Sequence, residues 1–437
     1  MLILSNKFTF TATGDSFISR RLPARPYKGF KEITDILNRN EFRFTNFEMI
    51  TPDDFETPSA MSGGTWANAN PEVIKDIKRF GFNCVAWANN HTLDFLYEGL
   101  RSTKKYLEKE QIVNVGVGLH LSEASKPKYV EMQNGRVGLI GVTTTFHDTW
   151  KAGEQRKDGP GRPGVNGISH RSVYSISEND MTTLEKISKK TDINAKRNLD
   201  VLEGFIKEDT PNYFFGNNEF KVSNNYDSKV IPDSDDIERI IKSIHEAKNR
   251  SDYVIVSIHS HEMQGEDKFK PAQFIEEISK QFIDEGADAI IGHGPHILRG
   301  IEIYKEKPIF YSLGNFIFQN DTVNYLPADF YKDYNLYSDS DIYEAISERS
   351  KNDTRGLGVN KYVWESIIVS WEFDNNLVSS IKLYPISLQG HLKNYNRGWP
   401  ILSRDISVLN HVSNLSKAYG TEIKIKEDYA EIVIMRK

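Results

Sequence analysis

Histidine, carboxylate and amide side chains recur in this chain at one kind of position, directly after a short apolar run typical of a β-strand. His259 and His261 follow the apolar run 253–258. Because they are two residues apart, both would face the same side of an extended strand. Imidazole nitrogens, carboxylate oxygens and amide oxygens together are the ligands that divalent metal ions prefer. The pattern therefore predicts a metal or substrate site at strand ends.

Six expected strands share this feature. They span residues 8–13, 42–47, 84–88, 253–258, 289–291 and 309–313. The polar residues at or beyond their ends are Asp15, Asn46, Glu48, Asn89, Asn90, His91, Asp94, His259, His261, His293, His296 and Asn315. In open α/β sheets, ligands bind outside the carboxyl ends of the strands. If the strands are mostly parallel, we expect these side chains to converge on one crevice.

Each of these residues also has a purely structural interpretation. Asp15 fits a helix cap, Glu48 a solvated turn, and 89–91 a turn that ends in a packed histidine. The last histidine pair flanks a Gly-Pro dipeptide that fits an ordinary turn. The same-face pair at 259 and 261 is harder to explain in this way. Five of the eleven histidines lie at three of the strand ends, and together they favour a metal or substrate site.

The elements that must position these residues alternate along the first three hundred residues. Short apolar strands are separated by amphipathic helices, a pattern typical of a layered α/β fold. Helices are expected from Pro71 to Gly81, from about Asp235 onward, and from about Phe274 to Gly286. Each places its apolar residues on one face, as a helix buried on one side does.

The domain organisation follows from changes in this pattern. Residues 148–234 contain a Gly/Pro-rich stretch at 157–167 and an Asn-rich stretch at 217–225. We expect them to form an insertion or cap, since long excursions in compact domains are usually functional or mobile. The main domain would span 1–364. Residues 365–437 would supply further strands and a helix, completing that domain or appended to it.

Composition narrows the function classes. The chain has 437 residues, a formal net charge of -6 and a pI of about 6.1, so we expect neither nucleic acid nor an anionic membrane surface as a partner. Its one cysteine, Cys84, lies in an apolar run and is expected in the core. No apolar run approaches the ~20 residues of a membrane helix, and the start lacks a signal-peptide core. We therefore expect a cytoplasmic protein.

Taken in order, the motifs resemble the CapA family of bacterial poly-γ-glutamate capsule synthesis proteins. The blocks that carry the resemblance are 14–15, 46–48, 63–67, 88–94, 161–164, 293–296, 311–316 and 397–400. They cover nearly the whole chain, and Asn-Asn-His-x-x-Asp with Tyr-Ser-Leu-Gly-Asn-Phe is the most specific combination. The resemblance implies the fold of calcineurin-like metallophosphoesterases, a four-layer α/β/β/α sandwich of two mixed sheets flanked by helices.

The resemblance also implies roles for individual residues. It implies one or two divalent ions (Mn, Mg, Zn or Fe), with His91 as the proton donor to the leaving group. The implied metal ligands are Asp15, Glu48, Asn90, His259, His293 and His296. Three departures are Phe17, where the phosphoesterases have a histidine, the closing pair His293 and His296, which lie three apart instead of two, and the His-Ser-His at 259–261. One of the two metal positions would then be weak, or rebuilt with His261.

Other side chains would support the reaction. Asp94, one turn beyond His91, could fix its tautomer, and the planar guanidinium of Arg162 could steady negative charge. Asn46, Asn89 and Asn315 are expected to contact substrate. Trp66 could stack on substrate or pack in the core.

Three functions fit these expectations. The first is a metal-dependent hydrolase or transferase that acts on poly-γ-glutamate or a related cell-envelope polymer by means of activated water. The second is a non-catalytic accessory of the capsule-synthesis machinery that binds an anionic polymer. Its binding residues would be Arg20, Arg21, Arg162 and Arg299. The third is a phosphodiesterase or phosphatase.

Overall fold

The computed structural model describes residues 7–54, 56–207, 210–337, 339–375 and 377–434. Within these ranges the chain is a mixed α/β protein with eleven α-helices and several sheets. It forms two compact units. The main unit runs up to Gly167 and resumes at Glu238, and the second unit is Ile168–Ile237. None of the described helices combines the length and apolar character needed to cross a lipid bilayer.

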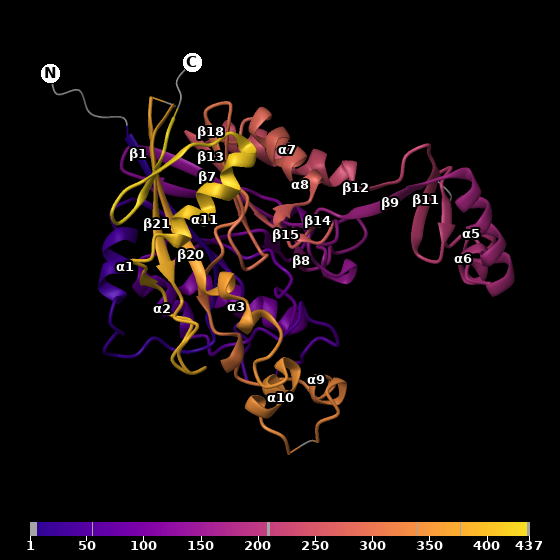
Figure 1. The fold of residues 1–437 in the computed structure, drawn as a ribbon, viewed down its shortest axis with the longest axis horizontal. Helices are drawn as coiled ribbons and strands as arrows, with labels where there is room; N and C mark the ends of the chain where they lie inside the picture. Colours follow the sequence, from indigo (N-terminus) through magenta and orange to yellow (C-terminus); the bar gives the residue numbers. More distant parts are fainter. Residues whose placement is uncertain (1–6, 55, 208–209, 338, 376, 435–437) are drawn as a thin grey trace. The chain divides into compact units, whose positions relative to one another are not determined.

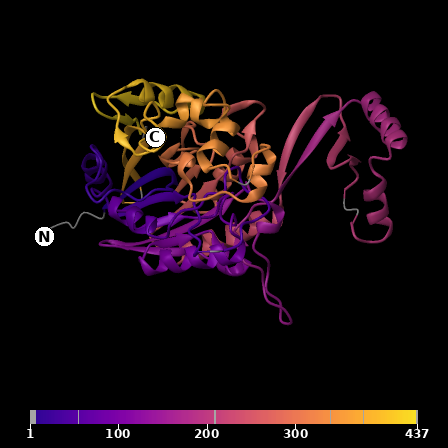
Figure 2. The ribbon, with the colours of Figure 1, turned by 90° about the horizontal axis from the view of Figure 1, so that it is seen from below.

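The larger sheet of the main unit is built around β1 (Lys7–Phe17). It pairs in parallel with β2 (Phe42–Phe47) and antiparallel with β20 (Glu365–Asp374). Figure 1 labels β1, β20 and β21, and Figure 2 shows the same ribbon from below. The strand order is β23-β24-β21-β20-β1-β2-β3-β4. The remaining bounds are β3 (Cys84–Ala86), β4 (Val113–Val115), β21 (Leu377–Ser387), β22 (Ile401–Leu402), β23 (Ile423–Ile425) and β24 (Ala430–Ile432).

The second large sheet has six strands in the order β17-β18-β16-β13-β7-β6. Its central strand β13 (Tyr253–His259) is buried along its whole length and is parallel to both neighbours, β7 (Gly135–Thr143) and β16 (Ala289–His293). A continuous apolar run is what a strand covered on both faces requires. The others are β6 (Lys128–Met132), β17 (Ile301–Tyr304) and β18 (Lys307–Phe310).

One buried apolar cluster joins the two sheets. It contains Phe8 and Phe10 from β1 and Tyr253 and Ile255 from β13. The rings of Phe8 and Tyr253 lie 4.7 Å apart, and Phe10 stacks on Trp371 of β20 at 5.0 Å. The contacts of Phe8 and Phe10 with Tyr253, the second at 5.9 Å, join the two sheets, whereas the Phe10–Trp371 stack lies within the larger sheet.

Helices cover a second apolar cluster on the other face of the larger sheet. It takes in buried side chains of α1 (Phe30–Leu37), α2 (Val73–Phe80) and α3 (Leu96–Lys109). The helices expected near 71–81, 235 and 274–286 are present as α2, α7 (Ser234–Lys248) and α8 (Gln273–Asp284). Cys84 is fully buried, as expected.

Five of the six expected strand ends differ from the structure. β3 ends at Ala86, two residues early, and β13 and β16 continue to His259 and His293. The other two differ more. The first strand does not stop before Asp15 but continues to Phe17, with register shifts around Asp15. The run 309–313 is not one strand: β18 ends at Phe310, and Asn315 begins β19 (Asn315–Phe318), which pairs with the end of β1. The extension of β1 depends on this long-range pairing, which local sequence does not encode.

The second unit has a four-stranded sheet with the order β10-β11-β9-β12. Its strands are β9 (His170–Ile176), β10 (Tyr213–Phe215), β11 (Asn218–Val222) and β12 (Asp227–Pro232), and its helices are α5 (Glu178–Thr191) and α6 (Ala195–Leu202). In the main unit, α11 (Ser407–Ser416) contributes Val408, Leu409 and Val412 to the inter-sheet cluster. The predicted boundaries at 148–234 and after 364 stay predictions.

Candidate metal centre

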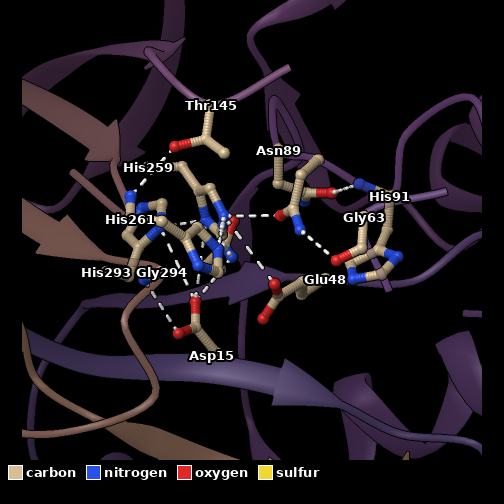
Figure 3. Close-up of polar contacts among 12 residues, drawn as sticks. Asp15, Glu48, Gly63, Asn89, His91, Thr145, His259, His261, His293 and Gly294 are labelled. Carbon is tan, nitrogen blue, oxygen red and sulfur yellow. Dashed lines mark hydrogen bonds and ion pairs between the residues drawn. The ribbon is translucent and has the colours of Figure 1, made fainter. Parts of the chain in front are cut away.

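Two groups of three side chains meet where the strands of both sheets end. Asp15, His259 and His293 form the first group, and Glu48, His261 and His296 form the second. Within each group the possible ligand atoms all lie within 4.8 Å of one another. Figure 3 shows the labelled members pointing toward a common centre. Among the described residues, these are the groups whose geometry suits a metal ion.

Strand register brings the first group together. His259 and His293 are direct neighbours on the parallel strands β13 and β16. On the other sheet, Asp15 is paired with Asn46 of β2 and Asn315 of β19. Gly14 permits this close approach, since a Cβ there would lie 1.8 Å from the carbonyl oxygen of Gly314. The parallel strands thus deliver residues far apart in sequence to one place.

The hydrogen bonds of the first group leave ligand atoms facing one another. Asp15 accepts hydrogen bonds from the amide of Asn46 at 2.7 Å and the backbone N–H of Gly294 at 2.9 Å. The Nδ1 atoms of His259 and His293 are 3.0 Å apart. Ser257 contacts Nε2 of His293, so Nε2 can carry the proton and Nδ1 can keep its lone pair.

The second group contains a buried carboxylate without a donor. Neither oxygen of Glu48 has a hydrogen-bond partner among the described residues, although the side chain is fully buried. His259 Nε2 and His296 Nδ1 each lie 3.7 Å from a Glu48 oxygen. His259 Nε2 also lies 2.8 Å from Asn90 Oδ1 and 3.1 Å from His261 Nε2. Burying an unpaired carboxylate is costly, and a cation bound at this position would offset that cost.

Burial sets the protonation of the cluster. It raises the pKa of Asp15 to about 7, and it raises the pKa of Glu48 well above its usual value, with the Asp15 charge adding to the effect. It lowers the pKa of His261 to about 4 and of His293 to about 3, and it lowers the pKa of His259 and His296 well below the usual value. The imidazoles are thus neutral at pH 7, which is the form that binds metals.

These observations fit one or two divalent ions. The possible ligand atoms are oxygen and nitrogen, and the fold already holds them close together. Within the described part of the chain, the two carboxyl groups also lack a nearby positive charge that would allow both of them to ionise. Asp15, Glu48, Asn90 and the four histidines are the residues that would hold such ions. Their individual roles as ligands remain predictions.

His91 lies beside the cluster and is oriented by Asp94. Its Nδ1 is 2.7 Å from Asp94 Oδ2, which also accepts a hydrogen bond from the backbone N–H of Ala67 at 2.7 Å. Burial raises the pKa of Asp94, and the contact with His91 acts to lower it. A carboxylate bound to Nδ1 fixes the tautomer with that proton, which leaves Nε2 of His91 for proton transfer.

The remaining predicted residues fall into two sets. Asn315 contacts His296 Nδ1 at 2.9 Å, and Asn89 accepts from the backbone N–H of His91 at 3.0 Å, so both orient cluster residues. Trp66 is buried, and its indole N–H donates to the carbonyl of Ser59. Arg162 is exposed and donates to the carbonyl of Lys151. The side-chain hydrogen bonds of Arg162 reach Lys151 and not the cluster, so its role in steadying negative charge stays a prediction.

Several residues at the site were not predicted from the sequence. Ser257 could have been found, because it lies two residues before His259 and faces the same side of β13. The pocket beside the cluster could not have been predicted from the sequence. Its volume is about 240 Å³, and His91 and His296 line it together with Phe17 and the segment 346–358. That segment carries no motif.

Comparisons with known proteins agree on one family. The model of the family described as "Bacterial capsule synthesis protein PGA_cap" matches residues 9–320. The uncharacterized protein y4sH of Sinorhizobium fredii is 35% identical over 433 residues, which cover 96% of this chain and 92% of that protein.

Several relatives carry functional names, among them two CapA proteins. The capsule biosynthesis protein CapA of Bacillus anthracis is 25% identical over 72% of this chain and 60% of its own length. The PGA biosynthesis protein CapA of Bacillus subtilis is 28% identical over 57% of this chain and 46% of its own length. This chain thus spans about half the length of these two proteins.

Proposed function

We propose, on the premise that this chain belongs to the bacterial capsule synthesis protein family PGA_cap, that it is a metal-dependent hydrolase or transferase. Its substrate would be poly-γ-glutamate or a related capsule or cell-envelope polymer, as the names of the two CapA relatives suggest. The observation that carries the proposal is the buried cluster of two carboxylates and four neutral imidazoles beside an open pocket.

The chain's own groups would divide the chemistry between them. Asp15, Glu48, Asn90 and the histidines would hold one or two divalent ions, which when bound lower the pKa of water and stabilise developing negative charge. His91 would protonate the leaving group from Nε2, since Asp94 occupies Nδ1. Asn46 would keep Asp15 oriented through its amide hydrogen bond.

The four-layer α/β/β/α sandwich is part of this proposal. The apolar cluster between the two sheets supports its two inner layers. The buried faces of α1, α2 and α3 support one outer layer, and α7, whose Ala247 lies against β7 at Gly138, supports the other.

Turnover assays with a matched variant test the proposal. γ-Glutamyl amide and phosphoester substrates are incubated with metal-loaded protein, chelated protein and metal-loaded His91→Ala. We expect turnover that chelation removes and that His91→Ala lowers by roughly 10²–10⁴-fold, with metal content unchanged because His91 belongs to neither ligand group. Absence of turnover for every substrate class would contradict an enzymatic role.

A non-catalytic role in binding an anionic polymer is the second candidate. The four arginines expected to serve it do not support it. Arg21 is paired with Asp76 at 2.6 Å, Arg299 is fully buried and donates to the carbonyls of Glu262 and Lys268, and Arg162 bonds its own loop. Arg20 donates to the carbonyl of Arg397. Other arginines, in the pocket beside the cluster, favour anion binding.

A further inference from the structure

The pocket beside the metal-ligand cluster is lined by two chemically different sets of polar side chains. His91 and His296 form one set, and Arg349 and Arg355 form the other. At about 240 Å³ the pocket is smaller than the 300–1,000 Å³ of sites for drug-sized ligands. It therefore suits one small unit of a substrate.

Arg349 is a partly buried cation without a carboxylate partner. It lies in the last turn of α10 (Ile342–Ser350), and its guanidinium donates to the hydroxyl of Thr65 and lies 5.6 Å from the ring of Phe330 in α9 (Ala328–Asp333). Figure 1 shows these two helices close together. No carboxylate of the described residues lies within ion-pair distance of Arg349. Burial lowers its pKa, which an incoming anion would reverse.

Arg355 is placed over Arg349 by the turn that follows α10. Its Nε donates to the carbonyl of Arg349 at 3.1 Å. The turn contains three consecutive non-glycine residues, 351–353, with φ between 48° and 56°. Such left-handed conformations are uncommon outside glycine and are held by their surroundings. The fold thus keeps a second arginine in the lining of the pocket.

The charges around these arginines favour an anion. Asp321 also lines the pocket, but Arg397 binds it through Nε at 2.8 Å and Nη2 at 2.6 Å. Arg20 also acts on the charge of Asp321, and Asp353 lies 4.0 Å from the Arg397 guanidinium. Four arginines against two aspartates leave a net positive charge, which attracts an anionic ligand.

Apolar side chains form the rest of the wall. Phe17, Phe318, Ile346 and Leu357 line the same pocket as the arginines and the two histidines. Phe17 is the residue at which the sequence departs from the phosphoesterase pattern, and its ring contacts His91 edge-on at 5.7 Å. An apolar wall beside cationic side chains suits a ligand with a short methylene chain ending in a carboxylate.

We propose that Arg349 and Arg355 bind a substrate carboxylate and so select a carboxylate-bearing chain, with the reacting bond toward His91. This inference rests on the proposed function only for the position of the reacting bond. The planar guanidinium groups recognise the carboxylate through paired N–H donors, and the apolar wall covers the methylene groups.

Calorimetric titration of the metal-loaded protein tests the inference without requiring turnover. The probes are glutarate, its neutral analogue glutaramide, and inorganic phosphate. The variants are Arg349→Gln, Arg355→Gln and Arg349→Lys, with Arg101→Gln on the exposed face of α3 as the control. Melting temperature and metal content are recorded for each, so that a folding defect is recognised.

We expect glutarate to bind and glutaramide and phosphate to bind more weakly. Arg349→Gln should weaken glutarate binding by about 10–100-fold, the loss of a charged hydrogen bond. Arg355→Gln should weaken glutarate binding less, because Arg355 is exposed. Arg349→Lys should retain part of the affinity that Arg349→Gln loses, and Arg101→Gln should match the wild type. Unchanged glutarate affinity in both glutamine variants of the pocket, equal binding of glutaramide, or tighter binding of phosphate would overturn the inference. Glutarate binding with this pattern but no turnover would overturn the proposed enzyme and leave the carboxylate site standing.

Discussion

At the scale of single residues, the metal-free cluster has a definite protonation pattern. The pKa values of the four imidazoles are lowered, so these groups are held neutral. Burial raises the pKa of Asp15 to about 7 and that of Glu48 well above its usual value, because it disfavours the charged form of each. A divalent ion changes this balance, since it lets the carboxyls ionise and uses the imidazoles in the form they already have. The cluster therefore links metal, pH and stability.

We predict that chelated protein is most stable near pH 6.5. Below that value the four histidines are protonated in the unfolded chain but not in the folded one, whereas the two carboxyls are protonated only in the folded one. The unfolded chain therefore binds more protons in total. The free energy of unfolding then rises with pH. Above it the histidines no longer contribute. The folded state alone then loses protons from Asp15, with its pKa of about 7, and from Glu48, so stability falls.

Urea unfolding between pH 5 and 9 checks this prediction. Asp15→Asn removes one of the two carboxyls and should flatten the alkaline fall, and added metal should remove it. A stability that keeps rising to pH 9 in the chelated wild type would contradict the protonation pattern.

At the scale of elements, the site depends on the close contact of β1 with the chain between β18 and β19. The backbone N–H of Asp15 donates to the carbonyl of Gly314 at 2.9 Å, and Gly314 itself has φ 72°. Both glycines are required there. Gly14 allows the two backbones to approach each other, and Gly314 adopts the positive φ of the turn. A small change in this contact would move Asp15 away from the histidines of the other sheet.

We predict that Gly14→Ala destabilises the protein by about 2–4 kcal/mol, because its Cβ would overlap a backbone oxygen that cannot rotate away. Metal affinity should fall with it, as Asp15 shifts. Gly159→Ala is the matched control, since nothing lies within 4 Å of a Cβ at that position. Unfolding curves and metal titration measure both, and equal behaviour of the two variants would refute the argument.

Some of these elements follow from the sequence and others do not. The apolar run of β13 and the helical period of the apolar residues in α2 and α8 are local patterns, so both could be predicted from the sequence. The strand-end position of the histidines also follows, because period and polarity are local. The pairing of β1 with β19 and the return of the segment 346–358 to the site do not, since contacts between distant residues fix them.

At the scale of the whole molecule, the candidate site belongs to one unit. Every residue of the two ligand groups lies in the main unit, and so do His91 and the pocket arginines. A hydrogen bond within the main unit also connects the residues on either side of the second unit in the chain: Arg239 donates to the carbonyl of Gly167 at 2.7 Å. The main unit therefore holds its own core and its own chemistry.

We predict that replacing 168–237 with a short Gly-Ser linker leaves a folded protein with unchanged metal stoichiometry. The ends to be joined are close, so the loop costs little closure entropy. Thermal unfolding and elemental analysis of the shortened chain measure the outcome. A shortened protein that folds cooperatively but retains no metal would show that the second unit is needed for the site.

The central claim is that residues from both sheets form one centre that binds a divalent ion. Elemental analysis of the full chain, after loading with Mn, Mg, Zn or Fe and removal of free ions, tests it most directly. We predict one or two retained ions per chain, fewer in Asp15→Asn and in His259→Ala, and an unchanged number in His245→Ala, whose side chain pairs with Glu285 on the surface. A folded wild-type chain that retains none of these metals would contradict the account.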